Sequence, residues 1–145
     1  MLAQWIALAR ALGAARGAAL SLTLHRAFDL VPDPAVALEE AVALGFDRIL
    51  TSGCAPRAID GLATLAALHA QAAGRIVLLA GSGVAAAVVP AILATGIREV
   101  HASARTLHDT SVDAPERRFG FIGAQTGDTD AAQVAALVEK LRAGS

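Results

Sequence analysis

The stretch RIVLLAGSGV, residues 75–84, joins an almost unbroken apolar run to a turn that contains two glycines. Strands covered on both faces have this continuous apolar pattern, whereas half-exposed strands alternate apolar and polar residues. The run therefore predicts a buried strand over 75–81. Three other runs have the same character, namely LSLTLH (20–25), DRILTS (47–52) and REVHAS (98–103).

Helical patterns separate these four runs. The clearest one has Asp33 as an N-cap before Pro34, and Gly45 ends it. Further helical patterns are expected at 56–74, 86–96 and 129–144. Strand and helix in regular alternation predict an α/β fold with a parallel sheet. Two architectures satisfy this order, a doubly wound open sheet and part of a (β/α)₈ barrel.

The chain of 145 residues is predicted to form a single domain with four parts. We expect a leading amphipathic helix, four strands with their crossover helices, a long polar loop and a last helix. A loop of this length in a compact domain is usually functional or mobile. The expected boundaries are 1–19, 20–104, 105–128 and 129–145.

Composition excludes several classes of protein. Hydrophobic residues make up 55% of the chain, and the net charge is −1, so no basic stripe is available to follow a nucleic acid backbone. No apolar run reaches the roughly 18 residues of a membrane span. The one cysteine, Cys54, excludes an internal disulfide or a thiolate cluster and predicts a cytoplasmic location. Its thiol is expected to be half-buried and structural.

Polar and glycine residues gather where the four predicted strands end. In both architectures ligands bind at the carboxyl ends of the parallel strands. The asymmetry between polar strand ends and ordinary strand starts therefore predicts one shared pocket. The four strand ends are HRAFD (25–29), TSGC (51–54), AGSGV (80–84) and HASAR (101–105).

Four ionisable residues at these ends are candidate catalytic residues. His25, Asp29 and His101 could carry out acid–base chemistry or bind a metal. Arg26 could clamp an anion, or it could simply pair with Asp29 or Glu99. The sequence does not show that the two histidines meet.

The turns after two of the strands are candidate ligand-binding segments. Segment 80–84 combines glycines with the start of a helix, an arrangement that suits a phosphate or carboxylate, although such glycines also serve turns alone. Segment 51–54 could donate hydrogen bonds to a polar ligand, or Ser52 could cap a helix. The predicted ligand-binding residues here are Thr51, Ser52, Gly53, Gly81, Ser82 and Gly83.

The strings LTLHRAFD, RILTSG, RIVLLAGSGV and EVHAS, in this order over about 20–104, resemble the CutC family. These are cytoplasmic proteins named for copper homeostasis, with a TIM-barrel fold. The resemblance implies that the chain is the C-terminal half of such a barrel, with AGSGV after strand seven at a barrel phosphate position. The positions that would line the barrel mouth are His25, Arg26, Asp29, Thr51, Ser52, Gly81, Gly83, His101 and Ser103.

A complete barrel needs about 250 residues, and four strands leave two sheet edges open. The chain is therefore expected to pair with a second copy or with a complementing half-barrel, unless it is an inactive fragment. Copper enters only through the resemblance. Copper(I) prefers sulfur ligands, and the chain offers only Cys54 and Met1. The residues themselves favour a pocket for a small phosphorylated or carboxylated molecule, and they decide neither an enzymatic activity nor a metal site.

Overall fold

A parallel sheet of four strands forms the centre of the protein, which is described here as a computed structural model over residues 1–144. Each strand pairs in parallel with the next, so the predicted parallel α/β fold is confirmed. The order of strands across the sheet follows their order along the chain. The strands are β1 (Thr23–Leu24), β2 (Arg48–Thr51), β3 (Val77–Gly81) and β4 (Glu99–His101).

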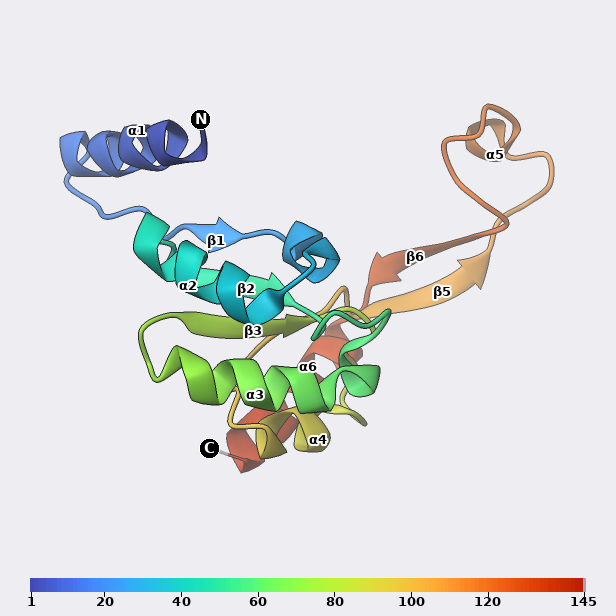
Figure 1. Ribbon diagram of the computed structural model, residues 1–145. Helices are drawn as coiled ribbons and strands as arrows, with labels where there is room; N and C mark the ends of the chain where they lie inside the picture. The colour runs from blue at the N-terminus through green and yellow to red at the C-terminus, as the bar shows by residue number, and fades with distance from the viewer. Residues whose placement is uncertain (145) are drawn as a thin grey trace.

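Helices cover one face of this sheet and leave the other face open (Figure 1). Ile49 and Leu78 point into the helical layer, whereas Val77, next to Leu78, is 39% exposed. The expected cover on both faces is therefore wrong for residues 1–144. Right-handed crossovers place successive helices on the same side of a parallel sheet. The covering helices are α2 (Pro34–Leu44), α3 (Leu62–Ala72), α4 (Val89–Ala94) and α6 (Ala131–Ala143).

The ends of α2 follow the prediction. The Asp33 side chain accepts hydrogen bonds from the amides of Ala35 and Val36, and Gly45 takes the left-handed conformation that ends the helix. Other boundaries differ. β1 stops at Leu24, so His25 is no longer part of the strand, and the rest of HRAFD forms the 3₁₀ helix η1 (Arg26–Leu30). The helix expected over 56–74 is divided into η2 (Ala58–Asp60) and α3.

The leading helix α1 (Leu2–Ala15) lies beyond β1, at one end of the layered body (Figure 1). Arg10 attaches it: its guanidinium donates to the carbonyl oxygens of Leu20 (2.5 Å) and Gly45 (2.7 Å) and to the Asp47 carboxylate (2.9 Å). Gly13 is the one buried residue of α1. Among residues 1–144 no helix combines the length and the apolar character that a bilayer crossing requires.

The polar loop expected over 105–128 is instead an antiparallel hairpin, formed by β5 (Arg105–Asp109) and β6 (Gln125–Thr129) around the short helix α5 (Pro115–Arg118). Figure 1 shows this hairpin projecting from the body with α5 at its tip. All five residues of β5 are exposed, so backbone pairing forms the hairpin without a buried apolar face. Hydrophobic periodicity therefore cannot reveal it.

Candidate anion-binding site at the strand ends

A pocket of about 320 Å³ lies at the carboxyl ends of the four strands. It brings together residues from the first and last strand ends, which lie at opposite edges of the sheet in chain order. His25 and His101 thus line one common space, which the sequence alone did not establish. The lining residues are His25, Arg26, Leu50, Ser82, Gly83, Val84, His101, Ala102 and Ser103.

The Asp29 carboxylate lies outside this lining and is the centre of a buried hydrogen-bond cluster. Its side chain is 7% exposed. It accepts hydrogen bonds from the Thr51 hydroxyl (2.5 Å), from the Ser52 hydroxyl (2.8 Å) and amide (3.1 Å), and from the Cys54 amide (3.1 Å). The cluster therefore ties η1 to the loop that follows β2.

The protonation of Asp29 is set by opposing effects. Burial alone would raise the pKa of its carboxyl group, but the hydrogen bonds from Thr51, Ser52 and Arg26 stabilise the charged form and lower the pKa below its ordinary value. A carboxylate that stays ionised and whose oxygens already accept several hydrogen bonds is suited to holding its neighbours in place. It is poorly suited to the acid–base role that the sequence suggested.

Arg26 connects this cluster to the pocket. Its Nε donates to Asp29 (2.8 Å) and its Nη2 to the Ser52 hydroxyl (2.8 Å), while Nη1 has no partner within residues 1–144. The side chain is 32% exposed. The predicted pairing with Asp29 is present, and Glu99 pairs with Arg48 instead. Arg26 is thus a positioned cation with donor capacity left for an anion.

The turn after β3 supplies the second wall of the pocket. Ser82 and Gly83 have left-handed backbone angles (φ +75° and +65°), and the Ser82 hydroxyl donates to the carbonyl oxygen of Pro56 (2.8 Å). The amides of Gly83 and Val84 donate to no acceptor in the described part of the chain. The helix expected from residue 86, close to this turn, begins only at Val89.

The structure does not bring all predicted ligand-binding residues to the pocket. Thr51 and Ser52 are completely buried around Asp29, and Gly53 is buried against the backbone of Gly61. Ser52 caps no helix either, since Gly61 is the N-cap of α3. Gly81 acts through close packing, because a Cβ there would lie 2.6 Å from the Leu50 side chain.

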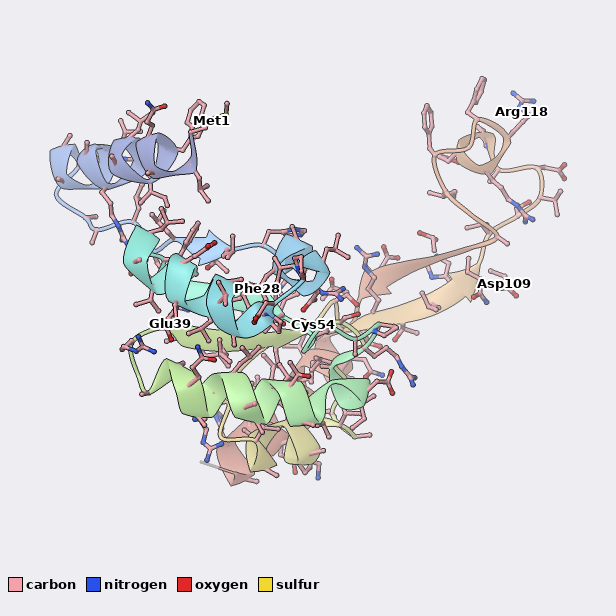
Figure 2. The ribbon with its side chains drawn as sticks, in the orientation of Figure 1. Met1, Phe28, Glu39, Cys54, Asp109 and Arg118 are labelled. Atoms are coloured by element: carbon pink, nitrogen blue, oxygen red, sulfur yellow. The ribbon has the colours of Figure 1, made fainter. Side chains whose placement is uncertain are left out.

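Cys54 differs from its expected half-buried state, since it is exposed. Figure 2 shows it on the body of the protein, far from Arg118 at the hairpin tip. Partial desolvation of the thiol and the nearby Asp29 charge raise the pKa of Cys54. The nucleophilic thiolate is therefore disfavoured.

The donor set does not fit a copper(I) site. No group of three His, Cys, Asp or Glu side chains that could hold a metal ion occurs among residues 1–144. Met1 is 93% exposed at the start of α1, and the thiol of Cys54 lies outside the pocket lining. His25 and His101 are the metal-binding types in the pocket, and two imidazoles are fewer ligands than a tetrahedral site needs.

Two features of the structure are not predicted from the sequence. One is the close approach of Gly61 to Gly53, and the other is the ion pair between Arg48 and Glu99 on the open face (2.8 Å). The close approach of the two glycines has no sequence signature. For the ion pair a partial signal exists. Arg48 and Glu99 occupy the second positions of the two predicted strands on either side of the strand at 77–81, where a charge on a covered face would be costly.

The Asp29 cluster predicts how stability depends on pH. A carboxyl group whose pKa is lowered by folding contributes stability above its unfolded pKa of about 3.9, and this contribution is lost as pH falls through the folded pKa. We expect the free energy of unfolding to fall below about pH 4, and to fall less steeply in Asp29→Asn. Urea unfolding at a series of acidic pH values measures both slopes, and identical slopes would contradict the prediction.

The chain is an α/β protein with a parallel sheet and a pocket at the carboxyl ends of its strands. The model of the CutC family matches residues 6–106. The chain belongs to the CutC family.

Relatives support this assignment. The family protein CutC of Xanthomonas campestris pv. campestris strain B100 is 46% identical over 124 residues, which cover 85% of this chain and 52% of that protein. The family protein CutC of Agrobacterium fabrum is 45% identical over 119 residues, covering 81% of this chain and 47% of that protein. The chain thus spans about half the length of the curated relatives it matches.

A solved structure agrees with the fold. The crystal structure of the candidate copper homeostasis protein CutC from Streptococcus agalactiae aligns with a TM-score of 0.54 and 36% identity. The alignment covers 57% of this chain and 41% of that one. Over the aligned residues, the two proteins are therefore similar in both backbone fold and sequence.

Proposed function

We propose that the strand-end pocket binds a small phosphorylated or carboxylated molecule. The observation that carries this proposal is the state of Arg26, which Asp29 and Ser52 hold in place while its Nη1 remains without a partner in residues 1–144. The amides of Gly83 and Val84 offer further donors on the opposite wall. A fixed guanidinium with nearby amides is complementary to a phosphate or carboxylate group.

We also propose that the chain forms the C-terminal half of a CutC-family barrel. The sheet order β1-β2-β3-β4 supports this, because a doubly wound sheet reverses its order at a switch point. The open face, where a barrel would have its interior, supports it as well. In this interpretation the turn at 82–83 is the phosphate-binding loop that follows strand seven of a barrel.

A role in copper homeostasis is proposed from the relatives, one of which carries that description. The misfit of the donor set to copper(I) favours an indirect role, exerted through the small-molecule ligand in the cytoplasm. The second candidate function is binding of copper(II) or zinc, and the observation that favours it is the presence of His25 and His101 in one pocket.

Removing the Arg26 guanidinium should abolish most of the anion affinity. A charge-assisted hydrogen bond contributes about 1.5–3 kcal/mol, so Arg26→Ala should weaken binding of inorganic phosphate by about 10- to 100-fold in isothermal titration calorimetry. Arg75→Ala is the matched control, because Arg75 pairs with Glu39 on the surface and lies outside the pocket. Equal affinities in the two variants would contradict the proposal.

The two candidate functions respond differently to one further variant. If the pocket binds a metal, His101→Ala should abolish binding of copper(II) and zinc while Arg26→Ala should not. If the pocket binds an anion, Arg26→Ala should have the larger effect, on phosphate. Measured with both probes on the same two variants, the pattern separates a metal site from an anion site.

A further inference from the structure

We propose that His25 donates a hydrogen bond to the bound ligand through Nε2, and that it completes a set of donors which fits a phosphate group better than a carboxylate. This inference rests on the anion site of the proposed function and narrows its ligand to a phosphorylated molecule. It also gives the two histidines of the pocket different roles.

The backbone fixes which ring nitrogen of His25 carries the proton. His25 is the N-cap of η1, and its Nδ1 accepts a hydrogen bond from the amide of Ala27 (3.3 Å). A backbone amide is always a donor, so Nδ1 must present its lone pair, and the proton of the neutral ring is on Nε2. Nε2 makes no hydrogen bond within residues 1–144, and His25 lines the pocket. Nε2 is therefore a donor available to a ligand.

His101 is not fixed in this way. It ends β4 and lines the same pocket, but its imidazole has no hydrogen-bond partner in the described part of the chain. Either of its ring nitrogens can carry the proton of the neutral form, so its tautomer can follow the ligand. Of the two imidazoles, only that of His25 has its donor set before a ligand binds.

The donors of the pocket come from the ends of three neighbouring strands. His25 follows β1, and the guanidinium of Arg26 is held at Ser52, after β2. The amides of Gly83 and Val84, which are unpaired within residues 1–144, follow β3. Neighbouring strands lie about 4.8 Å apart, so the three strand ends span about 10 Å of backbone. A small anion in the pocket is therefore within reach of donors from all three.

This arrangement selects among anions by their shape. A phosphate group has three terminal oxygens in a tetrahedral arrangement, whereas the acceptor sites of a carboxylate lie in one plane. Donors that converge from three strand ends can each bond a different phosphate oxygen. The pocket volume of about 320 Å³ is in the range of small-molecule sites, which leaves room for the organic part of a phosphorylated molecule.

The same hydrogen bond weighs against His25 as a metal ligand. A metal binds the lone pair of an imidazole nitrogen. The Nδ1 lone pair already accepts from the Ala27 amide, and freeing the Nε2 lone pair would place the proton on Nδ1, against that amide. We therefore expect His25→Asn to leave zinc affinity unchanged, and a clear loss of zinc affinity would contradict the assignment.

A spectrum of the unaltered chain tests the proton position directly. The measurement is a long-range ¹H–¹⁵N correlation of the four histidine rings under mildly alkaline conditions. We expect the His25 ring to show a protonated Nε2 and an unprotonated Nδ1. A proton on Nδ1 would overturn the assignment, whatever anion the pocket binds.

Calorimetric titration with inorganic phosphate and with acetate tests the donor role. Asparagine is a good N-cap, so His25→Asn keeps an acceptor for the Ala27 amide but loses the Nε2 donor. It should weaken phosphate binding by about 10-fold, the lower end of the effect of a hydrogen bond to a charged group, with an unchanged circular dichroism spectrum. His25→Gln, whose amide nitrogen can take the place of Nε2, should retain most of the affinity. His108→Asn, on the exposed strand β5, is the control and should bind phosphate as the unaltered chain does.

The outcomes separate this inference from the anion site itself. Phosphate binding that depends on Arg26 but not on His25, or equal affinities for phosphate and acetate, would overturn the inference and leave the anion site in place. Absence of phosphate binding to the unaltered chain would overturn both. We expect weaker phosphate binding in His25→Asn, recovery in His25→Gln, and weaker binding of acetate than of phosphate to the unaltered chain.

Discussion

Asp29→Ala should destabilise the protein by about 2–6 kcal/mol, because a buried donor without an acceptor costs about 1–3 kcal/mol and Thr51 and Ser52 would both be left in this state. The buried carboxylate accepts from Arg26, Thr51 and Ser52 at once. Without it, the completely buried Thr51 and Ser52 lose their acceptor, and each unsatisfied donor adds a desolvation cost. The free energy of unfolding, measured by urea titration near neutral pH, gives the size of the effect.

A matched control exists in the same chain. Asp60 pairs with Arg57 (2.9 Å), and the two residues are three apart in sequence, as Asp29 and Arg26 are. Both side chains of the Asp60–Arg57 pair are largely exposed. Because exposed ion pairs contribute about 1 kcal/mol or less, Asp60→Ala should have a small effect. Comparable losses in the two variants would mean that burial around Asp29 does not determine its contribution.

Gly53→Ala should be the second severe substitution. Its Cβ would lie 2.3 Å from the carbonyl oxygen of Gly61, and the backbone there has φ +73°. The left-handed backbone alone costs a residue with a Cβ about 1–2 kcal/mol, and overpacking against a fixed backbone adds about 1–3 kcal/mol or more. We therefore expect a loss of about 4 kcal/mol in the free energy of unfolding.

Gly45→Ala separates the two contributions. Gly45 has a similar backbone angle (φ +83°), but a Cβ at this position would meet nothing within 4 Å. This variant should show only the conformational cost, about 1–2 kcal/mol. If both variants lose the same stability, the close approach of Gly53 and Gly61 is relaxed in solution and does not hold the loop after β2.

The sequence predicted the elements whose stability comes from apolar burial. The four strands lie within the four predicted runs, and the caps of α2 follow from Asp33, Pro34 and Gly45. The hairpin β5–β6 was missed because its pairing is made by backbone groups with exposed side chains. Periodicity reports burial, so it says nothing about such a segment.

The sequence predicts where the residues of the candidate site lie, but it does not predict what each side chain does there. Strand ends on a parallel sheet must share one side, and His25, Arg26 and His101 line one pocket there. The roles of Asp29, Thr51 and Ser52 depend on a 3₁₀ turn that carries Asp29 back under the loop after β2. No local pattern specifies such a turn, so the sequence predicts Asp29 as a catalytic residue and Thr51 and Ser52 as ligand contacts, whereas in the structure Asp29 and Ser52 hold Arg26 in place.

The most direct test is a titration of the ¹⁵N-labelled protein with inorganic phosphate, followed through amide chemical shifts. An anion held by the fixed guanidinium and the turn after β3 predicts saturable shifts at Arg26, Gly83 and Val84. Shifts confined to Arg117 and Arg118 at the hairpin tip, or no saturable shift at the strand ends, would contradict the account.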